Sequence, residues 1–143
     1  MRKVIDGDVD LRKLYLTELL DLSDVEVTGY FTCYNNDLTN LKGAPHTVGG
    51  SLSCGNNYLT SLQGAPKTVG GWFYCYDNDL TSLKGAPETV GGGFDCCYND
   101  LTSLEGIPKT IGGSFYIDEA LKDKFSEEYI RIMCKITGNV VYV

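Results

Sequence analysis

The stretch LTSLKGAPETVGGGFDC, residues 80–96, is one of four copies of a phrase that returns every 21 residues along this chain. The repeated positions form columns of identical or similar residues. The clearest columns are Phe31, Leu52, Phe73 and Phe94; Cys33, Cys54, Cys75 and Cys96; Asn36, Asn57, Asn78 and Asn99; Leu38, Leu59, Leu80 and Leu101; Leu41, Leu62, Leu83 and Leu104; and Pro45, Pro66, Pro87 and Pro108. A fixed period of this kind is the signature of a solenoid, whose coils bury their apolar edges on one another.

Each Phe-x-Cys segment follows a Gly-Gly pair and alternates in polarity, which predicts a short parallel strand with Phe and Cys facing the core. Stacked strands would hold neighbouring cysteines about 4.8 Å apart with parallel side chains, whereas a disulfide needs converging Cβ atoms about 3.8 Å apart. A zinc site needs four ligands that converge on one point, often from CxxC pairs. The cysteine column therefore indicates core packing, with a thiolate metal site as the weaker alternative.

Each asparagine of the Asn column comes where the chain leaves its strand and bends. A buried amide there has donors and acceptors without charge, so we expect it to bond the backbone of its own coil and of the next coil. The glycine and proline that follow leave no room for a full helix on the return path. Extended or 3₁₀ turns are expected there instead.

The pattern L/F-x-C-x-x-N-x-L-x-x-L with a following proline resembles the leucine-rich repeat, in a short form similar to that of bacterial effector proteins. The wording LTSLxGAPxTVGGxFxC resembles leucine-rich-repeat proteins encoded by tailed bacteriophages. Together with the columns, this resemblance predicts an α+β fold: a leucine-rich-repeat solenoid with a parallel β-sheet of about six short strands, a non-helical convex side and a C-terminal capping helix. It also implies a binding scaffold, because such repeats generally bind other molecules.

The sequence divides into three parts. Residues 1–30 are expected to form an N-terminal cap and degenerate repeat, residues 31–114 the four 21-residue repeats, and residues 115–143 the last strand, a capping helix and a C-terminal strand. Apolar residues from Val9 to Leu19 follow the repeat columns one residue out of phase, although their spacing also fits a helix.

Near the C-terminus, the apolar residues Leu121, Phe125, Tyr129 and Met133 recur every four residues and predict an amphipathic helix. That helix is expected to cap the last coil, and a dimerisation element is the alternative.

Charge and composition limit the classes of function. The 143 residues suit one domain and include 12 basic and 19 acidic residues, a net charge of −7 that is spread along the chain. No basic patch results, which argues against direct nucleic-acid binding. The charged N-terminus has no apolar run behind it, so we expect neither a signal peptide nor a membrane partner. The expectation is a cytoplasmic protein, in the host bacterial cytoplasm if a phage encodes it.

Residues suited to catalysis do not form a recognisable set. His46, the only histidine, occupies a column otherwise filled by Lys67, Glu88 and Lys109, which is typical of an exposed loop position. No Cys or Ser has an identifiable base, and the acidic bends lack the order of an EF-hand. We therefore predict that the protein is not an enzyme and uses no cofactor and no metal.

The outward strand positions indicate a binding face instead. Aromatic side chains with a polar tip are favoured at binding hot spots, and these positions vary from repeat to repeat while the core columns do not. The predicted protein-binding face, on the concave side of the sheet, consists of Tyr30, Tyr34, Trp72, Tyr74, Tyr76, Asp95, Tyr98 and Tyr116. High β-propensity also enriches Tyr and Trp on exposed strands and is the alternative explanation.

The sequence thus predicts a non-enzymatic protein-binding module. By resemblance it would be a phage-encoded accessory factor that inhibits or scaffolds a host or defence protein, and acidic loops beside the face favour a partner with a basic patch. One alternative is a virion or assembly protein that self-associates, for example as a homo-dimer. A second alternative is an aromatic platform for a nucleotide or a sugar.

Overall fold

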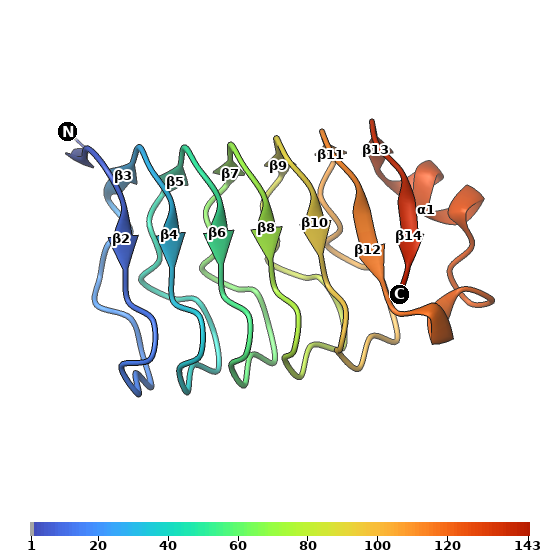
Figure 1. The fold of residues 1–143 in the computed structure, drawn as a ribbon, viewed down its shortest axis with the longest axis horizontal. Helices are drawn as coiled ribbons and strands as arrows, with labels where there is room; N and C mark the ends of the chain where they lie inside the picture. Colours follow the sequence, from blue (N-terminus) through green and yellow to red (C-terminus); the bar gives the residue numbers. More distant parts are fainter. Residues whose placement is uncertain (1) are drawn as a thin grey trace.

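The computed structural model describes residues 2–143 as a row of stacked coils whose two ends carry the two chain termini (Figure 1). Each of its two parallel sheets contains seven strands. The first, named here the threonine sheet, consists of β1 (Lys3–Ile5), β3 (Val25–Val27), β5 (Thr47–Val48), β7 (Thr68–Val69), β9 (Thr89–Val90), β11 (Thr110–Ile111) and β13 (Lys135–Ile136). The second, the aromatic sheet, consists of β2 (Val9–Asp10), β4 (Phe31–Thr32), β6 (Leu52–Ser53), β8 (Phe73–Tyr74), β10 (Phe94–Asp95), β12 (Phe115–Ile117) and β14 (Val140–Tyr142).

The predicted solenoid with a non-helical return path and a C-terminal helix is confirmed, but it has two parallel sheets rather than one. The additional sheet forms at the Thr-Val pair that precedes each Gly-Gly corner. There the return path is extended, and its backbone groups pair with the same residues of the adjacent coils, as in the register of Thr68 with Thr89. Stacking at a constant period therefore produces a sheet wherever the chain is extended, even over two residues.

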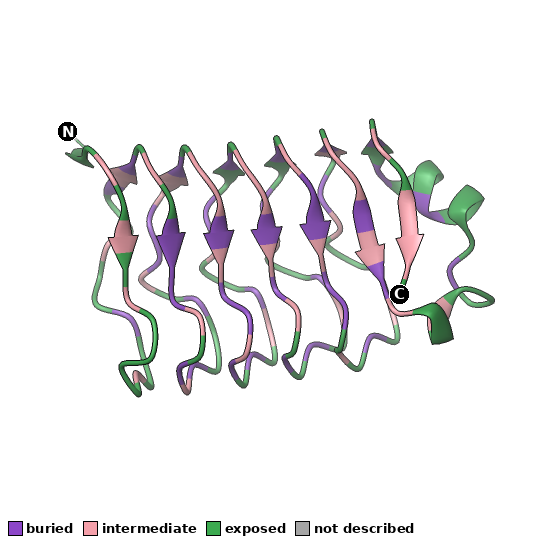
Figure 2. Cartoon of the chain, viewed as in Figure 1, coloured by how far each residue is buried: buried purple, intermediate pink, exposed green. Residues whose placement is uncertain are grey.

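The repeat columns fill the core as expected. The Phe column is fully buried, and its rings stack along the row, with centroids 5.1 Å apart for Phe73 and Phe94 and 5.7 Å apart for Phe94 and Phe115. The six cysteines are free and buried. Figure 2 shows this burial continuing along the inner strands and decreasing at the two ends of the row.

Burial controls the chemistry of the cysteine column. Removal from water raises the pKa of Cys33 to about 12 and raises the pKa of Cys54 and Cys75 well above the ordinary value of a thiol. A thiolate is the form that attacks electrophiles and binds metals. These thiols therefore remain protonated at neutral pH and act as packing groups, which confirms the packing interpretation of the column.

The asparagine column joins neighbouring coils. The Nδ2 group of Asn57 donates to the carbonyl of Cys54 in its own coil at 3.1 Å and to the carbonyl of Cys33 in the preceding coil at 3.1 Å. Its Oδ1 accepts the backbone N–H of Leu38 at 3.0 Å. Asn78 repeats the arrangement one coil later. Because these groups are buried, each amide satisfies backbone atoms that water does not reach.

The first coil follows the repeat rather than the alternative helix. Strand β2 pairs with β4 in parallel, with Val9 beside Phe31, so this coil is one residue longer than the regular ones. Most of its side chains are exposed, including Leu14 at 53% and Tyr15 at 86%. Strands β1 and β2 each have only one neighbour, so the described chain begins with two open sheet edges.

The predicted helix near the C-terminus is shorter than expected and uses another face. A 3₁₀ turn covers η1 (Glu119–Leu121), and the α-helix α1 (Glu127–Met133) begins only after Ser126, whose side chain accepts the N–H of Tyr129. Ile130 is fully buried, whereas Tyr129 and Met133 are exposed. The chain bends before Ser126 because the ring of Phe125 is buried and its carbonyl accepts the hydroxyl of Tyr142. Strands β13 and β14 follow the helix in the chain and form a seventh coil.

The asparagine column yields a stability prediction. Asn57→Ala is expected to lower the free energy of unfolding by about 3 kcal/mol, because buried backbone groups of two coils lose their partners. Asn40→Ala is the control, since the Asn40 side chain is exposed and accepts only the N–H of Lys42. Its expected cost is below about 1 kcal/mol. Urea denaturation followed by circular dichroism measures both, and equal midpoints would contradict the role given to Asn57.

Candidate functional site

Three aromatic residues project from one coil of the aromatic sheet. Trp72, Tyr74 and Tyr76 alternate with the buried Phe73 and Cys75, so all three point outward. Their side chains are half-buried although they lie on the outer surface, because they lean on one another and on neighbouring coils. The face is therefore an ordered surface rather than a set of separate side chains.

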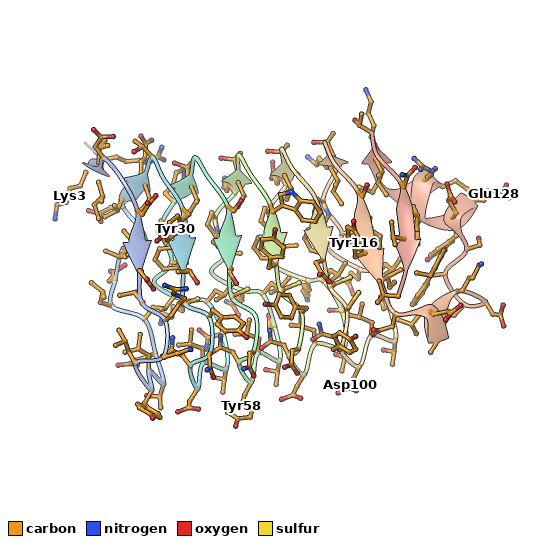
Figure 3. All side chains as sticks on the ribbon, viewed as in Figure 1. Lys3, Tyr30, Tyr58, Asp100, Tyr116 and Glu128 are labelled. Atoms are coloured by element: carbon orange, nitrogen blue, oxygen red, sulfur yellow. The ribbon has the colours of Figure 1, made fainter. Side chains whose placement is uncertain are left out.

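The rings of this face form a continuous chain of contacts. The rings of Trp72 and Tyr74 are nearly parallel, with an interplanar angle of 8° and centroids 5.4 Å apart. The Trp72 ring also lies 5.7 Å from the Tyr116 ring, and Tyr74 meets Tyr76 edge-on at 6.2 Å. Tyr76 continues to Tyr34 at 6.2 Å. We call these five residues the aromatic cluster; Figure 3 shows the side chains of this sheet, with Tyr30 and Tyr116 labelled.

Two glycines make the contacts between distant coils possible. Trp72 and Tyr116 are two coils apart, and the indole bridges the intervening coil by lying over Gly93, where a Cβ atom would overlap its ring. Tyr76 lies in the same way over Gly55, where a Cβ atom would be 3.0 Å from its Cζ atom. Both glycines are buried beneath these rings. Because they have no side chain, they leave room for the Trp72 and Tyr76 rings to pack directly on the backbone.

A hollow of about 330 Å³ adjoins the cluster on its N-terminal side. Residues Arg12, Tyr30, Thr32, Tyr34, Ser53 and Tyr76 line it. Arg12 is already engaged, because its guanidinium bonds both carboxylate oxygens of Asp10, at 2.9 and 2.8 Å, which lowers the pKa of Asp10. Ring edges, hydroxyl groups and a paired cation therefore surround this hollow.

Tyr98 lies apart from the other predicted residues. It occupies the bend after β10 with a left-handed φ of +57°, where the corresponding residues of the earlier coils are Asn35, Asn56 and Asp77. Its N–H donates to Asp118 at 2.8 Å, and it lines a separate hollow of about 590 Å³ near the C-terminal end. Its ring makes no stacking contact with the cluster. The structure thus brings Tyr34, Trp72, Tyr74, Tyr76 and Tyr116 together, with Tyr30 beside them, but not Tyr98.

Burial and neighbouring groups raise the pKa of two tyrosines of the cluster. Burial raises the pKa of Tyr74, and the nearby carboxylate of Asp95 adds to the effect. Burial also raises the pKa of Tyr76, with the neighbouring Tyr34 as the next cause. At neutral pH these groups are hydrogen-bond donors as well as contact surface.

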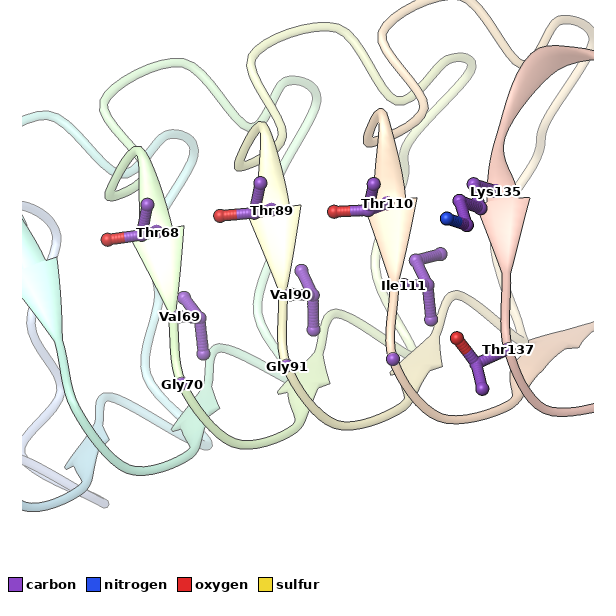
Figure 4. A pocket seen from close by; sticks show the side chains of 11 residues that line it. Thr68, Val69, Gly70, Thr89, Val90, Gly91, Thr110, Ile111, Lys135 and Thr137 are labelled. Atoms are coloured by element: carbon purple, nitrogen blue, oxygen red, sulfur yellow. The ribbon is translucent and has the colours of Figure 1, made fainter.

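The threonine sheet offers a plainer surface. Its outward column repeats Thr47, Thr68, Thr89 and Thr110 in register, and the C-terminal half borders a groove of about 450 Å³ that ends near Lys135 (Figure 4). Identical residues in these four coils give this side a uniform row of methyl and hydroxyl groups. It lacks the variation between coils that distinguishes the aromatic sheet.

Neither a metal-binding group nor a membrane-spanning helix occurs within residues 2–143. Within residues 2–143 no group of three His, Cys, Asp or Glu side chains is placed to hold a metal ion. The same part of the chain has no helix with the length and hydropathy needed to cross a membrane.

Comparisons with models of protein families, with curated proteins and with solved structures find no match to this chain.

Sequence reasoning found the aromatic residues but missed Arg12, Ser53 and the two glycines beneath the rings. The signal for the glycines is present in the outward columns, where Gly55 stands between Tyr34 and Tyr76, and Gly93 follows Trp72. A residue without a side chain between large neighbours marks a place where a ring lies over the backbone.

The position of Trp72 over Gly93 yields a second prediction. Gly93→Ala is expected to displace the indole toward solvent and shift its fluorescence to longer wavelength, because the new methyl group occupies the place of the ring. Stability should fall by less than about 1 kcal/mol, since a surface side chain yields more easily than backbone. Gly91→Ala is the contrast, because its methyl group would overlap the carbonyl of Gly70. That variant should unfold at lower temperature, and a similar result for Gly93→Ala would contradict the arrangement.

Proposed function

We propose that this protein is a non-enzymatic protein-binding module that uses the aromatic cluster as its contact surface. The supporting observation is the chain of contacting rings from Tyr34 to Tyr116 on the outer side of the sheet. Rings already held by neighbours lose little conformational freedom on binding, which favours affinity. The core columns are monotonous, whereas this face differs in every coil, as expected of a surface shaped for one partner.

The size of the face indicates a protein partner that reaches beyond it. Five coils about 4.8 Å apart, each showing about five residues spaced by 3.3 Å, give a platform of about 400 Å². A stable complex normally buries about 800 Å² on each partner. The bends beside the sheet supply the remainder, and they expose Tyr58, Asp79 and Asp100. Because these bends are acidic and the net charge is −7, the complementary partner carries a basic patch.

The setting of this activity follows from the resemblance of the repeats. The LTSLxGAPxTVGGxFxC phrase is similar to leucine-rich-repeat proteins of tailed bacteriophages. In that setting the protein acts as a phage accessory factor in the cytoplasm of the infected bacterium. It would inhibit or scaffold a host or defence protein by covering part of its surface.

Affinity capture from bacterial lysate, followed by titration of the purified partner, tests the proposed contact surface. Trp72→Ala with Tyr74→Ala is expected to weaken binding about 30-fold or more, because truncation of even one central aromatic residue commonly costs about 2 kcal/mol. Thr68→Ala with Thr89→Ala on the threonine sheet is the matched control and should bind as the unmodified protein does. Circular dichroism checks that both variants fold. A partner held equally by the aromatic variant would place the site elsewhere.

Self-association is the second candidate function, and the first coil favours it. This coil exposes Val4 at 58%, Leu14 at 53% and Leu20 at 59%, beside the open edges of β1 and β2. Exposed apolar side chains near an unpaired strand edge are typical of an interface between chains. If this candidate is right, sedimentation velocity at micromolar concentration should show a dimer that Leu14→Glu with Leu20→Glu converts to a monomer. A monomer without the substitutions would exclude it.

A further inference from the structure

Asp95 occupies the centre of the aromatic face. It lies in β10 between β8 and β12, in register with Tyr74 on one side and Tyr116 on the other. Trp72 contacts the ring of Tyr74 in its own coil at 5.4 Å and reaches the ring of Tyr116 at 5.7 Å by crossing the coil that carries Asp95. One carboxylate is therefore surrounded by three aromatic rings that come from two other coils.

The carboxylate has unused capacity to accept hydrogen bonds. Its Oδ1 accepts the backbone N–H of Cys97 at 3.0 Å. The ion pairs found within residues 2–143 join Arg2 to Glu26, Arg12 to Asp10 and Arg131 to Glu127, and none of them involves Asp95. The half-buried side chain thus carries a negative charge that no cation of the described chain neutralises.

The rings beside it are also without a cation. The cation–π contacts of residues 2–143 are those of Lys122 with Tyr142 and of Lys124 with Phe125, both at the C-terminal cap. The negative charge of Asp95 contributes to the raised pKa of Tyr74 and Tyr76, so its field reaches the cluster. Aromatic faces attract cations, most strongly when a ring is Trp, and a neighbouring carboxylate strengthens that attraction.

We propose that Asp95, Trp72, Tyr74 and Tyr116 form a binding site for a guanidinium cation, supplied by an arginine side chain of the protein partner. This inference rests on the proposed function and names the chemistry of its central contact. Arginine suits the site better than lysine because its planar head stacks on aromatic faces, and Trp72 and Tyr74, stacked on each other at 8°, hold their rings in a fixed orientation. Its N–H groups at the same time reach the carboxylate of Asp95.

The other end of the face does not compete for this arginine. There Asp10 is engaged by Arg12 of the same chain at 2.8 Å, so its charge is already neutralised. The hollow lined by Arg12 and Tyr34 has hydroxyl groups but no free carboxylate. At that end of the face, aromatic rings and an unpaired carboxylate therefore do not coincide as they do at Asp95.

Trp72 reports on the site directly because it is the only tryptophan of the chain. The probe is the blocked tripeptide acetyl-Gly-Arg-Gly-amide, titrated against the full-length protein while Trp72 fluorescence is recorded. A saturable change is expected, and added sodium chloride should weaken it. The matched probe contains citrulline, which keeps the planar shape of arginine without its charge. Equal responses to the two peptides would overturn the proposal.

Two variants distinguish the effect of the Asp95 carboxylate on peptide binding from the effect of the chain's overall negative charge. Asp95→Asn is expected to weaken binding of the arginine peptide about tenfold, because the charge-assisted bond is lost while the amide oxygen still accepts the Cys97 N–H. Asp123→Asn makes the same change of charge at an exposed turn between η1 and α1, away from the face, and should leave binding unchanged. Undiminished binding by Asp95→Asn, with an unaltered fluorescence spectrum of the free variant, would refute the site.

The partner protein distinguishes failure of this inference from failure of the proposed function. If Asp95→Asn binds the partner normally while the Trp72 and Tyr74 double variant does not, the face binds a protein but the cation site is wrong. If binding of the arginine peptide requires Asp95 but the partner binds the double variant as tightly as the unmodified protein, the cation site is right and the proposed function is wrong. A loss of about tenfold in partner affinity with Asp95→Asn supports both.

Discussion

Parallel stacking of equal coils is the constraint on which the rest of the structure depends. The coils are held in register by backbone hydrogen bonds and by asparagine side chains such as Asn57, which bonds carbonyls of two successive coils and accepts the N–H of Leu38. A buried amide with partners on both coils tolerates neither a shift of register nor a change of coil length, because either would leave polar groups unpaired away from water. The same register aligns the phenylalanines of the repeats in one row, and it aligns Cys33, Cys54, Cys75 and Cys96 in another.

That register also makes the aromatic face an ordered surface. Once core columns occupy the inward positions, the alternate positions face outward, and their content is free to differ between coils. The protein places large rings at Trp72, Tyr74 and Tyr76 and small residues at Gly55 and Gly93, so the rings lie across the backbone and contact residues two coils away. A carboxylate among them, at Asp95, combines contact area with charge. The threonine sheet is built on the same scaffold but repeats one residue type in the corresponding column.

The success of sequence reasoning differed between kinds of element. The solenoid, the buried Phe and Cys columns and the bend at each asparagine were predictable, because each residue type recurs at a constant spacing and alternation determines its direction. The second sheet was missed because two extended residues, such as Thr68 and Val69, are too few to show the alternation of polarity that marks a strand. The C-terminal helix was placed too early because apolar spacing of four residues from Leu121 to Met133 matched a helical face. Burial of Phe125 and capping by Ser126 determine the real start.

By itself, the sequence determined the period of the coils, which side chains point inward and which aromatic residues reach the surface, because these properties depend on the order of residues along one strand. Only the tertiary structure decided which surface residues meet. Trp72 rests over Gly93 and touches Tyr116, whereas Tyr98 lies at a bend beside Asp118. The physical reason is that a ring's orientation depends on the space left by residues of other coils, and that space exists only after the coils have stacked.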